Sequence, residues 1–318
     1  MRIFVAGATG AVGRSLVPLL VGKGHSVVGL TRTPKKADLL RNLGAEPVVA
    51  DALDEKAIHA AVAAARPDAI IHQLTDLKGV LDLRQFDRAF ASSNQLRTIG
   101  TDYLLAAARD CGVQRVVAQS FCGWPYARDG GYVKTEDDPL DPNPPQEFRG
   151  TLDAIRYLEN AVTTTPGFTG VALRYGGFYG PGTGVFDPSM LEQVRKRRMP
   201  LIGGGTAWWS FLHIDDAAAA AAVAVERGSG IYNIVDDDPA PVHVWLPALA
   251  AMLGAKPPFH VPAWLARLIA GEHLVVMMTQ SRAGSNAKAK RELGWSPRYS
   301  SWRQGFAGII KNEMQAAG

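Results

Sequence analysis

The sequence predicts an α/β protein built on a doubly wound parallel sheet, with a smaller C-terminal region beside it. Three observations predict this fold. A glycine-rich turn joins an apolar run to a helical segment within the first twenty residues, short β-rich runs then alternate with helical patterns, and glycine-rich punctuation replaces this alternation after residue 175. Strands that alternate with helices are typical of parallel sheets with helical crossovers.

The glycine-rich turn is the most informative element, and it follows the apolar residues 3–6. Its glycines are spaced three apart. Gly7 suits a tight turn, Gly10 the close approach of a pyrophosphate, and Gly13 close packing between helix and strand. Backbone N–H groups of the following helix would face the phosphates, so we expect a Rossmann-type dinucleotide site rather than a glycine-rich hairpin or linker. The expected contacts come from Gly7, Thr9, Gly10, Ala11, Val12 and Gly13.

The remaining elements continue the alternation in chain order. Further strands are expected at residues 26–30, 47–49, 69–72, 115–118 and 170–173. Helices are expected at about 11–23, 34–43, 54–65, 92–111 and 149–164. The proline-rich residues 139–145 cannot be helical and are expected to form a loop.

Two units follow from this pattern. Residues 1–175 are expected to form the dinucleotide-binding domain, and residues 208–234 to return to its sheet. Residues 176–207 and 235–318 contain short elements separated by glycine-rich turns, and they are expected to form a smaller substrate-binding region that closes over the cofactor.

The segment after the second strand bears on the choice of dinucleotide. It reads Thr31-Arg32-Thr33-Pro34-Lys35-Lys36 and contains three cations and no acid. A carboxylate at this place binds the ribose 2′-hydroxyl of NAD, whereas arginine accommodates the 2′-phosphate of NADP. With Arg32 and Lys35 as the phosphate contacts, the sequence favours NADP(H) over NAD(H). A solvated loop cation is the alternative for Arg32.

Three other strand ends carry polar candidates. Asp51 could accept from the adenine amino group, beside Ala52 and Leu53, or could serve the turn before the next helix. After the fourth strand, His72 is more typical of a packed histidine than of an acid or base. The backbone that follows it should pass near the cofactor at Gln73, Leu74 and Thr75.

Ser120 ends the fifth strand, where its hydroxyl could bind a substrate carbonyl or hydroxyl group or be satisfied in a local turn.

These residues together resemble the extended short-chain dehydrogenase/reductase superfamily, often labelled the NAD-dependent epimerase/dehydratase family. The resemblance spans nearly the whole chain and implies a Rossmann-type enzyme with a nicotinamide cofactor. Relatives often form homodimers through helices that match residues 92–111 and 149–164. The matching residues are Gly7, Gly10, Gly13, Asp51, Gly100-Thr101, 104–107, Ser120, Arg174, Tyr179-Gly180-Pro181-Gly182, 211–216 and 287–295.

One departure from the family is prominent. The resemblance implies a Tyr-x-x-x-Lys pair that transfers protons, but Thr151 and Ile155 stand at those positions, and no tyrosine of the chain has lysine four residues later. The chain is therefore identified as an atypical member. Loop tyrosines are the candidate replacement proton donors, although packing or substrate contact is the more typical role for each of them. These candidates are Tyr126, Tyr132, Tyr175, which would also contact the cofactor, and Tyr179.

Three residues are candidates for the substrate site. Trp208, with its neighbour in the pair Trp208-Trp209, could wall a pocket or be buried in the C-terminal region. The resemblance places His213 on the substrate side, with a structural hydrogen bond as the alternative, and places Arg282 where relatives often hold a substrate phosphate. Asp215-Asp216 is read as the cap of the following helix rather than as a catalytic pair.

Composition narrows the function classes. The net charge of +4 is too small to indicate nucleic-acid binding, the seven histidines lack metal-ligand spacing, and residues 217–225, the longest apolar run, are too short to cross a membrane. Cys111 and Cys122 are the only cysteines, which is typical of a cytoplasmic protein. A small-molecule substrate is therefore expected.

Three functions remain open on this sequence. The first is an NADP-dependent oxidoreductase that exchanges a hydride between NADPH and a small carbonyl or alcohol. The second is an epimerase or dehydratase acting on a nucleotide-sugar-like substrate with a tightly held cofactor. The third is an NADP-binding sensor or regulatory protein without turnover. Ser120 and a full C-terminal region favour an enzyme.

Overall fold

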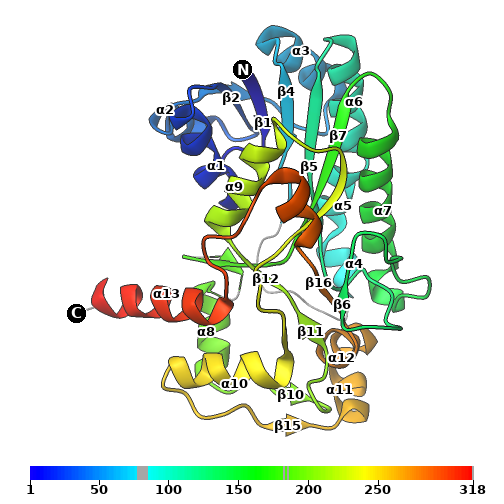
Figure 1. Ribbon diagram of the computed structural model, residues 1–318, viewed down its shortest axis with the longest axis vertical. Helices are drawn as coiled ribbons and strands as arrows, with labels where there is room; N and C mark the ends of the chain where they lie inside the picture. The colour runs from blue at the N-terminus through cyan, green and yellow to red at the C-terminus, as the bar shows by residue number, and fades with distance from the viewer. Residues whose placement is uncertain (77–84, 182, 185, 317–318) are drawn as a thin grey trace.

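A parallel sheet organises the chain in the computed structural model, which describes residues 1–76, 85–181, 183–184 and 186–316. Within these ranges seven strands lie in the order β13-β7-β5-β4-β1-β2-β3 (Figure 1). The order reverses between β1 and β4, which creates the crevice where open α/β sheets bind ligands. The strands are β1 Arg2–Ala6, β2 Ser26–Thr31, β3 Glu46–Val49, β4 Ala69–His72, β5 Arg115–Phe121, β7 Thr169–Tyr175 and β13 Gly230–Ile234.

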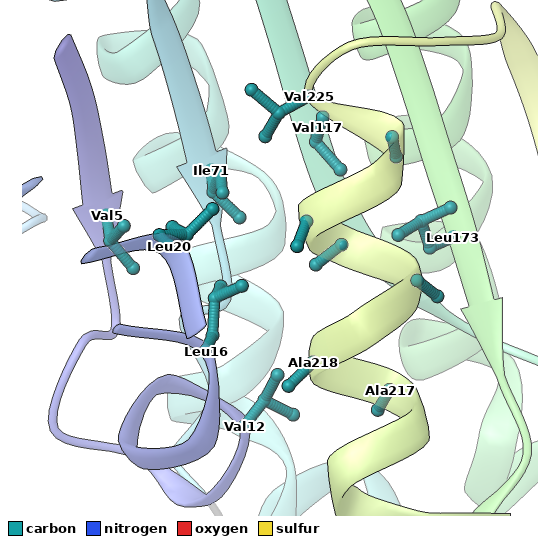
Figure 2. Close-up of a cluster of buried hydrophobic side chains, with 14 of the residues drawn as sticks. Val5, Val12, Leu16, Leu20, Ile71, Val117, Leu173, Ala217, Ala218 and Val225 are labelled. Atoms are coloured by element: carbon teal, nitrogen blue, oxygen red, sulfur yellow. The ribbon is translucent and has the colours of Figure 1, made fainter. Parts of the chain in front are cut away.

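Helices cover both faces of this sheet. One face carries α1 (Ala11–Gly22) and α9 (Ile214–Ala224), and Figure 2 shows their apolar side chains meeting those of the strands. The alanine-rich surface of α9 packs closely against α1, because its small methyl side chains let the two helix backbones approach each other. The other face carries α3 Glu55–Ala65, α5 Ala91–Arg97, α6 Ile99–Asp110 and α7 Arg149–Thr164.

The strands read as continuous apolar runs because both of their faces are buried. In β1, Ile3 and Val5 point into the core beneath α1 and α9, whereas Phe4 and Ala6 point into the core on the opposite face. The doubly wound parallel fold predicted from the sequence is confirmed.

Two of the predicted helices differ in detail from those observed. The helix expected at residues 92–111 is broken at Thr98, whose φ of −101° and ψ of −83° are not helical, so α5 and α6 are separate. The Thr98 hydroxyl donates to the Asn94 carbonyl at 2.9 Å and satisfies an acceptor at the end of α5. The segment expected at 34–43 divides into η1 (Pro34–Lys36) and α2 (Ala37–Asn42).

The C-terminal region lies below the sheet in Figure 1 and has its own apolar core, which includes Trp245, Trp302 and Phe306. Segment 208–234 is divided between the two parts, since β13 joins the main sheet and β12 pairs with β8. Gly182, part of the Tyr179–Gly182 motif, lies outside the described residues. Further elements are α4 Phe86–Ala89, β6 Val133–Lys134, η3 Gln146–Phe148, β8 Gly177–Gly180, β9 Thr183–Gly184, α8 Pro188–Arg195, β10 Leu201–Ile202, β11 Trp208–Trp209, β12 Phe211–His213, β14 Ala240–Pro241, α10 Val242–Met252, β15 His260–Val261, α11 Ala263–Ala270, α12 Glu272–Thr279, β16 Ala283–Gly284, η4 Ala289–Leu293 and α13 Trp302–Ala316.

In the part of the chain that the structure describes, every helix is too short or too polar to cross a bilayer.

Asp236 is a buried carboxyl where β13 meets the C-terminal region. It is 2% exposed, and its Oδ2 atom has no hydrogen-bond partner among the described residues. Burial raises the pKa of Asp236 to about 8, against hydrogen bonds from backbone N–H groups that favour the ionised form. The folded protein therefore holds this proton at pH values where the unfolded chain has released it.

We predict a pH-dependent stability from this group. Its contribution is complete below about pH 4 and is lost as the pH rises toward 8, because the folded state binds the extra proton throughout that window. The free energy of unfolding should fall by about 1.4 kcal/mol for each pH unit between the two pKa values, and so by several kcal/mol in total. The uncharged Asp236→Asn variant should flatten this slope in urea denaturation at several pH values. Equal slopes in the two proteins would contradict the prediction.

Candidate functional site

The glycine turn between β1 and α1 has no room for side chains. Gly7 has a φ of +93°, and a Cβ there would lie 2.6 Å from the carbonyl oxygen of Gln73. A Cβ on Gly13 would lie 2.4 Å from the Gly7 carbonyl oxygen, so α1 can approach β1 only with glycine at this position. The helix begins after Gly10 with no side-chain cap and no acid in its first turn. Its first N–H groups can therefore bind a phosphate.

A second feature of this edge fits a dinucleotide. Gln73 follows β4, and its Nε2 donates to the Tyr175 hydroxyl at 3.2 Å, while its buried Oε1 has no partner among the described residues. A buried acceptor without a donor is unfavourable unless a ligand supplies one. Leu74 and Thr75 continue along the same edge and are half-buried. The residues present therefore fit a nicotinamide dinucleotide, which would supply or accept a hydride when bound.

Arg32 lies next to this edge, directly after β2. Its side chain is 49% exposed and pairs with Asp76 at 3.2 Å, between Nη2 and Oδ2. This ion pair joins the ends of β2 and β4, which flank β1 and its glycine turn. Lys35 lies in η1 and is exposed. Both cations are accessible to a 2′-phosphate. To bind one, Arg32 would exchange its ion pair with Asp76 for one with the phosphate.

Asp51 takes part in the turn between β3 and α3. Its Oδ1 accepts from the Leu53 backbone N–H at 3.0 Å, next to buried Ala52. The following Asp54 caps α3 by accepting from the Ala57 N–H at 3.0 Å. The structure thus shows the turn role of Asp51, and its contact with adenine stays a prediction.

A buried polar network occupies the end of β5. The Ser120 hydroxyl donates to Oε1 of Glu159 on α7 at 2.6 Å. Arg174 of β7 donates to both Glu159 carboxylate oxygens at 2.7 Å, and it donates to the Tyr126 hydroxyl at 2.9 Å. Tyr126 in turn donates to Oδ1 of Asn233 in β13 at 2.7 Å. Ser120 and Tyr126, both catalytic candidates from the sequence, are therefore engaged in a chain that joins three strands and a helix.

Of the other tyrosine candidates, Tyr175 and Tyr179 are also buried, whereas Tyr132 is exposed. Tyr175 accepts from Gln73 and donates to the Ala217 carbonyl at 3.4 Å, whereas the Tyr179 hydroxyl has no partner among the described residues. Burial raises the phenol pKa of Tyr126, Tyr175 and Tyr179 above its ordinary value. A phenol with a raised pKa is a weaker acid, so none of the three is activated in this structure.

The two positions that stand in place of the family's Tyr and Lys have structural contacts. The Thr151 hydroxyl donates to Oδ1 of Asp87 at 2.6 Å and accepts from Asn94 Nδ2 at 3.0 Å. Ile155 is buried in α7. His72 is likewise packed, with its Nε2 at 3.1 Å from the Thr101 hydroxyl and its Nδ1 accepting from the Leu74 N–H. Burial lowers the His72 pKa to about 4, so its ring is neutral.

An aromatic pocket lies beside the end of β5. Its rings are in mutual contact, with centroids of Phe121 and Trp124 4.9 Å apart and those of Trp124 and Trp209 5.7 Å apart. Burial raises the pKa of the Cys122 thiol, which stays protonated. The Ser210 hydroxyl accepts a hydrogen bond from the Gly284 N–H and donates one to the Gly284 carbonyl. The described lining residues are Phe121, Cys122, Gly123, Trp124, Gly177, Trp209, Ser210 and Arg282.

Arg282 brings a positive charge to this pocket. Its guanidinium donates to the carbonyl groups of Gln280, at 2.7 Å, and Arg128, and it lies 5.1 Å from the Tyr132 ring centroid. The Nε atom has no partner among the described residues, and the neighbouring Arg128 takes the carboxylate of Asp141 in an ion pair. Arg282 is thus positioned to bind an anionic group.

The other substrate candidates lie outside the lining. The Trp208 ring stacks on that of exposed Tyr132, with ring centroids 5.5 Å apart. The next residue, Trp209, is the one that lines the pocket. His213 is buried and stacks on Tyr299, with ring centroids 3.8 Å apart. Its Nδ1 accepts a hydrogen bond from the Asp215 N–H at the start of α9. Sequence reasoning missed Phe121 and Trp124, whereas Trp209 belongs to the tryptophan pair that the sequence suggested as a pocket wall. The signal for the two missed residues was a pair of aromatic residues at and just after the end of β5.

The fold and the site define a Rossmann-type enzyme with a nicotinamide cofactor. The chain belongs to the NAD dependent epimerase/dehydratase family, which it matches over residues 3–235. Since similar proteins are named as reductases and epimerases, it is an enzyme of the oxidoreductase or epimerase type.

Two similar curated proteins are reductases by name. A Streptomyces protein named 3-diazoavenalumate denitrifying reductase is 42% identical over 309 residues, covering 96% of this chain and 99% of its own. A Stigmatella aurantiaca protein named 4-hydroxy-2-methyl-3-oxo-4-farnesyl-3,4-dihydroquinoline-1-oxide ketoreductase is 29% identical, covering 94% and 92%. Among solved structures, human epimerase family protein SDR39U1 with NADPH is similar in fold, with a TM-score of 0.76, 20% identity and coverage of 98% and 100%.

We predict that the buried pair of Glu159 and Arg174, at the end of β5, contributes strongly to the stability of the fold. Glu159→Gln should lower the free energy of unfolding by about 3–5 kcal/mol, because it leaves the buried Arg174 charge without its carboxylate. Glu192 offers a matched control, since it pairs with Lys196 on the surface of α8, and its change to Gln should leave the free energy of unfolding almost unchanged. Urea denaturation measures both, and similar losses in the two variants would contradict the role assigned to the buried pair.

Proposed function

We propose that this protein is an NADPH-dependent reductase that delivers a hydride to an aromatic electrophile, with an arenediazonium carboxylate as the substrate class. The observation that carries the proposal is the chemistry of the pocket. Its described lining is rich in aromatic rings and holds one cation, and none of its groups titrates near neutral pH in a way that would deliver a proton. A reaction that needs hydride alone suits such a site.

The proton balance separates diazonium from carbonyl substrates. A ketone takes a hydride at carbon and a proton at oxygen, so its reductase needs an acid. An arenediazonium ion, Ar–N₂⁺, takes the hydride alone and gives Ar–H and N₂, because the substrate's own positive charge balances the hydride. The phenols of Tyr126, Tyr175 and Tyr179, with their raised pKa values, are poor acids, which disfavours the first reaction and leaves the second unaffected.

The distribution of charge in the pocket lining supports the same substrate class. The faces of Trp124 and Trp209 carry negative quadrupole charge that stabilises a flat cation. Arg282 has no carboxylate partner among the described residues and would bind the substrate's acid group. The 42% identical relative is named for a diazo-substituted acid, which supports this assignment.

Carbonyl reduction is the second candidate, and the relative named as a ketoreductase favours it. In that reaction Ser120 would orient the substrate oxygen, and a tyrosine or water would supply the proton. The Ser120 hydroxyl already donates to Glu159 at 2.6 Å, so it is not free to bind a substrate oxygen, which disfavours this reaction.

We propose a cytoplasmic setting for the protein. Cys111 and Cys122 are free in the structure, and they would remain reduced there.

The expected reaction can be followed by isotope transfer. Purified protein should oxidise NADPH in the presence of a carboxylated arenediazonium salt, release N₂ and form the arene. With NADPH deuterated at the transferring position, the deuterium should appear on the arene ring, and D₂O solvent should contribute none. The rate should vary little between about pH 6 and 9. A reaction without protein measures the chemical background. Turnover of ketones alone would support the second candidate instead.

Arg32 tests the choice of dinucleotide. Arg32→Glu should weaken NADPH binding by about 10–100-fold, because a charge-assisted bond to the 2′-phosphate becomes a repulsion, and should change NADH binding much less. Arg41→Glu is the matched control, since Arg41 is exposed on α2 and pairs only locally with Asp38. Fluorescence titration of each dinucleotide gives the dissociation constants. Equal losses for NADPH and NADH would refute the preference for NADP.

A further inference from the structure

His273 is a buried imidazole whose polar atoms are unused. It lies at the second residue of α12 and is 1% exposed. Neither Nδ1 nor Nε2 has a hydrogen-bond partner within the described parts of the chain. Buried polar groups are normally hydrogen-bonded, and phenylalanine would fill the same space without this cost. Two free nitrogens on one buried side chain therefore point to a ligand.

The surroundings of His273 are aromatic. Its ring stacks on Phe148, with centroids 4.7 Å apart, and meets Phe86 edge to face at 4.4 Å. Burial lowers the His273 pKa to about 4, and no charged group contributes to that shift. The ring is therefore neutral at physiological pH and offers one N–H donor and one acceptor. A hydroxyl group, which also donates and accepts, is complementary to it.

Trp124 connects this ring cluster to the aromatic pocket. Its indole lines the pocket with Phe121 and Trp209, and its centroid lies 6.2 Å from that of His273. The same indole meets Phe86 at 6.1 Å. His273 is not among the described lining residues, so Trp124 is the link between the buried histidine and the pocket that Arg282 lines.

We propose that His273 determines substrate specificity by binding a hydroxyl group on the substrate's aromatic ring. The inference rests on the proposed function, which it deepens. The substrate class becomes a hydroxylated aryl carboxylate, with the carboxylate on Arg282, the ring against Trp124 and the hydroxyl on His273. His273 selects the substrate in this assignment and takes no part in the transfer of the hydride.

The test uses binding of ligands that contain no diazo group. 4-Hydroxycinnamate and cinnamate differ only in the hydroxyl, and each is titrated into the full-length protein while tryptophan fluorescence is recorded. Wild type should bind 4-hydroxycinnamate at least tenfold more tightly. His273→Phe should remove this preference by weakening 4-hydroxycinnamate alone, and its melting temperature should stay equal or rise. His273→Gln, which keeps a donor and an acceptor, should retain part of the preference.

His260→Phe is the matched control, because His260 is exposed in β15 and should leave both affinities unchanged. Equal affinities of wild type for the two acids, no binding of either, or equal losses of both in His273→Phe would overturn the proposal. These outcomes involve neither cofactor nor turnover. A preserved hydroxyl preference in a protein that fails to reduce diazonium salts would overturn only the proposed function.

Discussion

The buried ion pair between Glu159 and Arg174 is the interaction on which the architecture of the site depends. It joins α7 to β7, and through Ser120 and Tyr126 it extends to β5 and β13, so four elements are held at the sheet's carboxyl edge. Burying two charges is favourable only when each is fully hydrogen-bonded, and these partners provide the bonds. The hydroxyl groups of Ser120 and Tyr126 are therefore engaged in this network.

The glycine turn and the buried network have different roles at this edge. Gly7 and Gly13 leave no room for side chains, and α1 begins without a side-chain cap, so its first N–H groups can bind a phosphate. No tyrosine of the chain has lysine four residues later, and Thr151 and Ile155 have structural contacts. A site of this kind can supply a hydride without an acid. Reduction of a substrate that carries its own positive charge requires nothing more.

Much of the fold and part of the site could be predicted from local pattern. Strand and helix periodicity predicted the sheet. The family resemblance suggested Arg282 as a substrate residue; the structure shows it in the pocket lining, and its contact with substrate stays a prediction. The break at Thr98 was missed because its hydroxyl bond to Asn94 competes with the helix. The partner of Ser120 was also missed, since Glu159 lies 39 residues away on another element. Trp209 rather than Trp208 faces the pocket because adjacent strand residues point to opposite sides.

The sequence by itself determined the doubly wound sheet, the glycine cradle and the absence of the Tyr-x-x-x-Lys pair, because each is encoded in residues close together along the chain. The tertiary structure alone decided which hydroxyl groups are free, which rings line the pocket and that His273 has no partner among the described residues. Those properties depend on burial and on contacts between β5, α7, β11 and α12, and a linear pattern carries no information about such distances.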